Sequence, residues 1–150
     1  MNLTHHTHPD NLERYAFMWS EVRLLIAALA LFIGGIPPVI YFLPGGGAGI
    51  VFLLLKLSWI ISGVAAVYLL YRWLGNGQKL FGHKNMKDTI AFLVMTLSGI
   101  NLGLVGLIGT NVGMSISSSY AVFVITAVLY LASAYHLYTK WQKAGQSLFK

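Results

Sequence analysis

Four long apolar stretches separated by short polar segments dominate the chain, at residues 22–43, 50–73, 89–109 and 120–138. A helix of about 20 apolar residues is long enough to cross the hydrocarbon core of a bilayer. A backbone inside lipid finds no water to bond, so each stretch is expected to be helical. The pattern therefore predicts an all-α integral membrane protein, a bundle of four transmembrane helices.

Composition strengthens this prediction. Of the 150 residues, 57% are hydrophobic and only 9% are charged, against about a quarter charged in an ordinary soluble domain. The formal net charge of +6 is spread over short flanks, which argues against a nucleic-acid partner and leaves the lipid bilayer as the expected one. The chain has no Cys, so it can form neither a disulfide nor a Cys-based metal site.

Positive charge gathers on one side of the predicted bundle, in the segment after the second stretch and in the C-terminal tail. The loops at 44–49 and 110–119 have no charge at all. Because basic residues mark the cytoplasmic side, both termini and the middle loop are expected to be cytoplasmic. An aromatic belt is expected at the same interface, formed by Tyr68, Tyr71, Trp73, Tyr135, Tyr138 and Trp141.

Residues 1–19 are interpreted as a polar N-terminal tail, with Ser20 and Glu21 capping the first helix. The first apolar stretch begins too late for a cleavable signal peptide. A metal could bind the tail through His5, His6 and His8, but a cluster in a flexible tail is a weak signal. We expect neither a metal nor a cofactor.

The two halves of the chain resemble each other, which predicts an internal repeat. Tyr135 follows Tyr68 by 67 positions, Gly145 follows Gly77 by 68, and Gly99 follows Gly35 by 64. Each unit would be a hairpin of two helices, and an even number of spans gives repeats of parallel topology. The expected division is a first two-span repeat at 20–82 and a second at 83–150 with a basic C-terminal tail.

Two segments resemble the YuzA-like family of small bacterial two-span membrane proteins of unknown function. Residues 99–107, GINLGLVGL, are similar to the family's first helix, and residues 56–68, KLSWIISGVAAVY, to its second. Leu102 departs from the family's usual Trp, and Pro37-Pro38 replaces its Asn-Trp pair in the first half. The resemblance implies a tandem fusion of two such units in a bacterial inner membrane, and it implies no activity.

Small residues form a stripe along the third predicted helix. Gly99, Gly103, Gly106, Thr110 and Gly113 fall on one line at the helical period. Such a stripe lets a second helix approach closely. We favour packing within the fold, and an interface in a homo-oligomer is the main alternative.

Three further features could line a polar site. Asn101 needs a hydrogen-bond partner inside the membrane, and we expect Ser58, Ser62, Thr126 or Ser133 to supply it. Pro37 and Pro38 must kink or break the first helix. Lys56 is the one charge well inside a span, where it either snorkels to the interface or binds an anion. Asn111 is expected to be a cap or turn residue.

No catalytic constellation is visible in the sequence. The acidic residues Glu21 and Asp88 are placed at the cytoplasmic ends of the spans, so a carboxylate relay through the membrane is not expected. His136 is interpreted as an interface residue rather than a haem ligand. An enzyme would require Glu21, Asp88 and His136 to meet at the cytoplasmic face.

The sequence thus favours a non-enzymatic membrane protein, a structural or accessory subunit that packs through its glycine-rich helix. It would pack against itself or against a larger membrane complex. The alternative is a small channel or transporter whose path is lined by the Pro37-Pro38 break, Asn101 and Lys56.

Overall fold

The computed structural model describes residues 9–35 and 49–149, and no strand is present in these two ranges. The helices are α2 (Pro9–Phe32), α4 (Ile50–Gly75), α5 (Met86–Ile108), the short α6 (Val112–Ile116) and α7 (Tyr120–Lys143). Four of them, all except α6, are long and apolar enough to cross a membrane. The predicted all-α class and the four apolar spans are confirmed, and they indicate a membrane protein.

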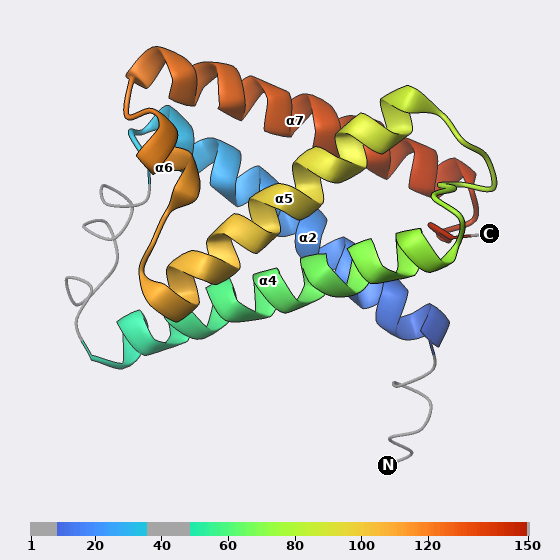
Figure 1. The fold of residues 1–150 in the computed structure, drawn as a ribbon, viewed down its shortest axis with the longest axis horizontal. Coiled ribbons are helices and arrows are strands. Elements are labelled where there is room, and N and C mark those ends of the chain that lie inside the picture. The colour runs from blue at the N-terminus through green and yellow to red at the C-terminus, as the bar shows by residue number, and fades with distance from the viewer. Residues whose placement is uncertain (1–8, 36–48, 150) are drawn as a thin grey trace.

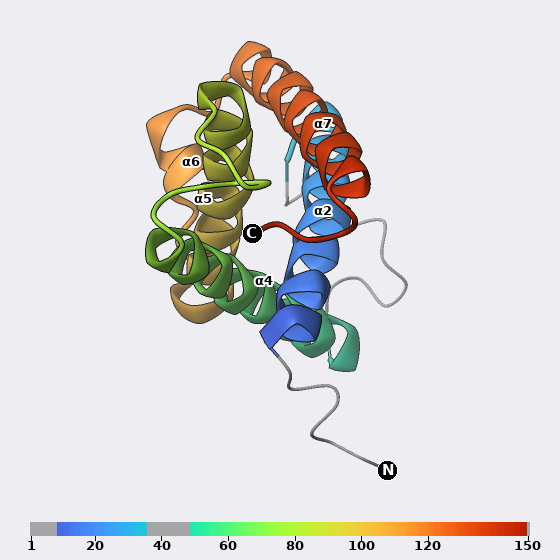
Figure 2. The same cartoon turned by 90° about the vertical axis from the view of Figure 1, so that its right-hand side faces the viewer.

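Successive long helices run in opposite directions along the long axis of the bundle, which is horizontal in Figure 1. The starts of α2 and α5 and the ends of α4 and α7 therefore lie at one end of the bundle, called here the terminal end. The closest packing joins α4 to α5 and α2 to α7, and Figure 2 shows these two pairs side by side. The strongest contacts thus connect the two halves of the chain rather than the two helices of each predicted hairpin.

The first helix was predicted at 22–43 after a polar tail at 1–19, and this is wrong for the described residues. Helix α2 begins at Pro9 and ends at Phe32. Proline suits the first helical position because its missing N–H has no intrahelical partner there, and Asp10 in the first turn complements the helix dipole. Ser20 and Glu21, predicted as the cap, are buried inside this helix.

The buried positions of α2 explain how polar residues continue into a membrane helix. Glu13, Phe17, Ser20 and Leu24 follow one another at spacings of three and four and are all buried. This spacing places them on one face of the helix, packed against the rest of the bundle. The buried face of α2 therefore mixes polar with apolar side chains, while many of its exposed residues are apolar.

The packed core lies toward the terminal end. Its centre consists of aromatic pairs, Phe17 with Trp141 at 5.1 Å and Trp73 with Phe92 at 5.6 Å between ring centroids. Trp73 and Trp141 are 8% and 2% exposed, so their expected place in an interfacial belt is wrong. Tyr71, at 73% exposure, does face outward.

Helices α4 and α5 cross at their glycines. A Cβ atom built on Gly103 would lie 2.7 Å from the Cα of Gly63, and one on Gly99 would lie 2.7 Å from the Cβ of Ala66. Gly106 packs as tightly against Ile60. Three residues of the predicted stripe, Gly99, Gly103 and Gly106, therefore face α4 inside this chain.

The stripe ends earlier than predicted. Helix α5 stops at Ile108, because Gly109 adopts a left-handed conformation with φ 74° and caps the helix. Gly113 lies in α6 and is exposed. Thr110 and Gly113 are thus not on the same helix face as the other three glycines.

The ends of α4 and α7 have the same local structure. Gly77 and Gly145 have φ of 64° and 71°, and Gln78 and Gln146 have φ of 60° and 62°. The N–H of each of these glutamines donates to the carbonyl five residues earlier, at 3.0 and 2.9 Å. This agreement at a spacing of 68 supports the proposed repeat.

The first helices of the two halves correspond at a different spacing from the one predicted. Gly35 follows the end of α2, whereas Gly99 lies in the middle of α5, so the spacing of 64 pairs unlike positions. At a spacing of 75, buried Phe17 corresponds to buried Phe92, and buried Glu13 to buried Asp88. Each of these two pairs joins buried residues of similar chemistry.

Candidate functional site

A cavity of about 400 Å³ lies between the helices, in the half of the bundle away from the aromatic core. Side chains from α2, α4, α5, α6 and α7 line it, and most of them are apolar. The volume falls in the range of roughly 300–1,000 Å³ that small-molecule sites occupy. We call this space the Arg23 cavity, because that residue supplies its one charged lining group.

Arg23 lies at the inner end of the Arg23 cavity and is only 6% exposed. One terminal nitrogen, Nη1, donates to Ser98 Oγ at 2.7 Å, and the other, Nη2, donates to the Met95 carbonyl at 2.6 Å. Its Nε is buried and has no hydrogen-bond partner within the described ranges. The guanidinium has more N–H donors than these two acceptors use.

Arg23 lies near the middle of the length of the bundle. Its partner Ser98 lies 12 residues after the start of α5 and 10 before its end, which is about 18 Å and 15 Å along the helix axis. A first helix that began at residue 22, as predicted, would instead have placed Arg23 at the edge of its span. An arginine at this depth is costly and is a functional-site candidate by default.

Gly99 makes room for the guanidinium. A Cβ atom at this position would lie 3.1 Å from Nη2 of Arg23, which is tighter than ordinary van der Waals contact. A residue larger than glycine at position 99 would therefore press on both Arg23 and α4. This glycine serves the polar site as well as the helix crossing.

Glu21 is the acidic residue that interacts electrostatically with Arg23. It lies two residues earlier on α2, about 200° around the helix, and forms no ion pair with Arg23 among the described residues. Its Oε1 is buried without a hydrogen-bond partner there. Glu21 thus sits inside a span, and the prediction that the spans contain no acidic residue is wrong.

The remaining polar groups of the Arg23 cavity bond to one another. Trp19 Nε1 donates to Ser62 Oγ at 3.0 Å, and Ser62 Oγ donates to the Ser58 carbonyl at 2.7 Å. The Tyr130 side chain hydrogen-bonds to Ser98. The inner end of the cavity is therefore polar and ordered, while its walls are apolar.

The Arg23 cavity reaches the side of the bundle. Three of its lining residues on α2, Trp19, Val22 and Ile26, are also 41%, 55% and 59% exposed. These exposed side chains belong to the apolar lateral surface that lipid would cover. The α2 lining of the cavity is therefore continuous with the exposed apolar surface of the bundle.

Asn101 connects α5 to α6 at the far end of the Arg23 cavity. Its Nδ2 donates to Asn111 Oδ1 at 3.0 Å, and its Oδ1 accepts from the Val112 N–H at 2.8 Å. The prediction of a Ser or Thr partner on another helix is therefore wrong. Asn111 is the N-cap of α6 and accepts from the Met114 N–H, which confirms its predicted role.

Of the two predicted path residues that the structure describes, Asn101 and Lys56, one reaches the Arg23 cavity. Asn101 lines it. Lys56 is exposed on α4 and borders a separate groove beside Phe52 and Ile108. Pro37 and Pro38, like the three N-terminal histidines, lie outside the described residues.

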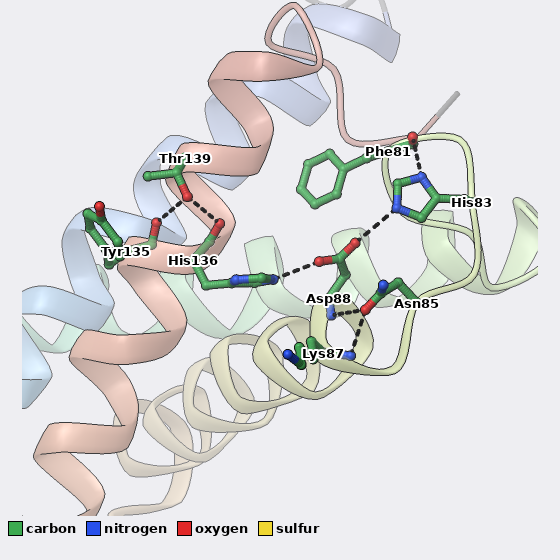
Figure 3. Close-up of polar contacts among 8 residues, drawn as sticks. All are labelled: Phe81, His83, Asn85, Lys87, Asp88, Tyr135, His136 and Thr139. Carbon is green, nitrogen blue, oxygen red and sulfur yellow. Dashed lines mark hydrogen bonds and ion pairs between the residues drawn. The ribbon is translucent and has the colours of Figure 1, made fainter.

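A second polar cluster lies at the terminal end, around the fully buried Asp88 (Figure 3). Its Oδ1 lies 2.6 Å from His136 Nε2 on α7, and its Oδ2 lies 3.3 Å from His83 Nε2. Asn85 caps α5 and accepts hydrogen bonds from the Lys87 and Asp88 N–H groups. Asp88 and His136 therefore meet as an enzyme would require, but Glu21 lies in the middle of α2 instead.

Glu13 connects α2 to α4 and to the C-terminal segment at the terminal end. Its Oε2 pairs with Arg72 of α4 at 3.0 Å. Its Oε1 accepts from the N–H groups of Leu148 and Phe149, at 2.9 and 3.2 Å. This carboxylate holds the C-terminal segment against α2, which is a structural role.

The sequence reasoning missed Arg23, Glu13 and Glu21 as residues of the bundle interior. The signal that could have found them is the Pro9-Asp10 pair, which is typical of a helix start. A helix that begins there turns the polar positions that follow into an inward face.

No family model, curated protein or solved structure matches this chain. The likeness to YuzA-like proteins therefore stays a prediction.

Proposed function

We propose that this chain is a non-enzymatic membrane protein that binds a small apolar or amphiphilic molecule between its helices. The single observation behind the proposal is the Arg23 cavity, about 400 Å³ with apolar walls and a polar inner end. An apolar molecule in this space would gain van der Waals contacts with the apolar lining.

The lateral exposure of Trp19, Val22 and Ile26 supports a ligand that arrives through the bilayer. Such a ligand would not need to leave the membrane to bind. We also propose that the protein lies in a bacterial inner membrane with both termini in the cytoplasm. We further propose that its two halves are tandem repeats and that it assembles into an oligomer or a larger complex. The glycines of α5 support assembly less, because α4 already covers three of them.

A substitution that fills the Arg23 cavity with a larger side chain tests whether a ligand binds there. Ala30 lines the Arg23 cavity, so Ala30→Phe would place a ring in the ligand's space. Ala121 is exposed and does not line the cavity, so Ala121→Phe is the matched control.

Each protein is extracted gently from its membrane and analysed by native mass spectrometry for retained small molecules. We expect a discrete bound species in the wild type and in Ala121→Phe, and its loss in Ala30→Phe. A wild type that retains only bulk lipid, in the same amounts as Ala30→Phe, would overturn the proposal.

A transport path is the second candidate, because Asn101 and Arg23 line the same cavity. Flux of an ion or solute into proteoliposomes tests it, with Asn101→Leu as the variant that should abolish the flux. No flux under any imposed gradient would exclude a path and leave binding alone.

A further inference from the structure

We propose that the Arg23 cavity selects an amphiphile with an anionic head, a carboxylate on a single apolar chain, which bonds to the Arg23 guanidinium. This inference rests on the proposed binding function and adds the class of ligand. Three observations lead to it: the charge of Arg23 has no direct counter-charge, its Nε has no hydrogen-bond partner among the described residues, and the cavity has apolar walls and a limited volume.

The charge of Arg23 lacks a direct counter-charge. Arginine stays protonated in proteins, and a buried cation is costly unless it is paired. The two acceptors of Arg23, Ser98 and Met95, are both neutral. No carboxylate lies within ion-pair distance of Arg23 among residues 9–35 and 49–149.

The guanidinium keeps a donor free. Its Nε has no partner in the described part of the chain, although the side chain is 6% exposed and lines the cavity. A buried donor without a partner is rare in proteins. A carboxylate is the acceptor that suits a guanidinium, and the N–H groups of Arg23 outnumber the two acceptors that it has.

The cavity walls decide between an amphiphile and a simple anion. Trp19, Ala27, Leu31 and Phe123 line the space together with other apolar groups. A chloride or phosphate ion would leave these walls in contact with water, whereas an alkyl chain would cover them. A space of about 400 Å³ suits one apolar chain, so the proposed ligand has a single chain.

Glu21 is the alternative counter-charge, and the structure makes it the weaker one. Its carboxylate lies on another side of α2, with one buried oxygen that has no hydrogen-bond partner among the described residues. It therefore influences Arg23 through space only. A ligand carboxylate in the cavity would contact the guanidinium directly.

Three probes with the same chain test the inference: dodecanoate, dodecanol and dodecyltrimethylammonium. Binding to the full-length protein in nanodiscs is measured at equal mole fractions in the bilayer by native mass spectrometry. A hydrogen-bonded charge pair should favour dodecanoate over dodecanol by about tenfold. The cation should bind more weakly than the alcohol.

Variants then assign the preference to one residue. Arg23→Gln should reduce the affinity for dodecanoate to that for dodecanol, while the affinity for dodecanol stays unchanged. Glu21→Gln, the control on the same helix, should keep the preference. The comparison of probes on the wild type remains decisive even where Arg23→Gln fails to fold.

The outcomes distinguish a failure of the anionic-head inference from a failure of the proposed binding function. Equal binding of dodecanoate and dodecanol to the wild type would overturn the anionic head and leave the cavity as a binding site. Binding of none of the three probes would overturn the proposed function itself. Loss of the preference in Glu21→Gln, with the preference kept in Arg23→Gln, would also overturn the role of Arg23.

Discussion

The crossing of α4 and α5 offers a quantitative test of the fold, through Gly103→Ala. The new methyl carbon would lie 2.7 Å from the Cα of Gly63, about 1 Å inside the ordinary carbon–carbon contact of roughly 3.5–4.0 Å. The obstructing atom belongs to the backbone, so no side chain can rotate away. The two helices must separate along a contact that connects the two halves of the chain.

The expected magnitude follows from two opposing effects. Overpacking of this kind costs about 1–3 kcal/mol, and alanine is favoured over glycine in a helix by about 1 kcal/mol. Gly103→Ala should therefore lower the free energy of unfolding by up to about 2 kcal/mol. Gly75→Ala is the matched control, because a Cβ atom there would meet nothing within 4 Å.

Reversible unfolding in mixed micelles, followed by circular dichroism, measures both variants. Gly75→Ala should be as stable as the wild type or slightly more stable. A Gly103→Ala protein as stable as Gly75→Ala would refute the close crossing, because the clash with Gly63 would then cost nothing.

Three further predictions concern the polar contacts. Asp88→Asn removes the charge from the bond to His136, so the same unfolding assay should show a loss of about 1.5–3 kcal/mol; an unchanged stability would contradict the pairing. Glu13→Gln weakens the hold on Leu148, so hydrogen exchange at that amide should accelerate by about tenfold; unchanged protection would exclude the contact. Asn101→Leu should raise exchange in α6 while α5 stays protected, and equal rates in both would oppose the assigned link.

The sequence predicted the last three long helices well, because their apolar residues are nearly continuous. The stretches at 50–73, 89–109 and 120–138 differ from α4, α5 and α7 by a few residues at the ends. The first helix was misplaced because its inward face is partly polar. A hydropathy pattern detects residues that face lipid. Glu13 and Ser20 belong to the same helix but are buried against protein, so they can be polar.

The candidate site depends on contacts that spacing along the chain does not reveal. Arg23 and Ser98 are 75 residues apart, and Asp88 and His136 are 48 apart. Their meeting depends on how the helices pack, which the sequence pattern leaves open. Asn101 was correctly identified as a polar residue in need of a partner, but its partner Asn111 lies only 10 residues away.

Photoaffinity labelling in the bilayer tests the central claim most directly. A diazirine-bearing single-chain carboxylate is incorporated into nanodiscs with the full-length protein, irradiated, and located by peptide mass spectrometry. Binding in the Arg23 cavity predicts labels that concentrate on its lining residues, such as Trp59, Leu102 and Tyr130, and that unlabelled dodecanoate displaces. Labels spread over lipid-facing residues such as Val64 and Ile125, with no displacement, would contradict it.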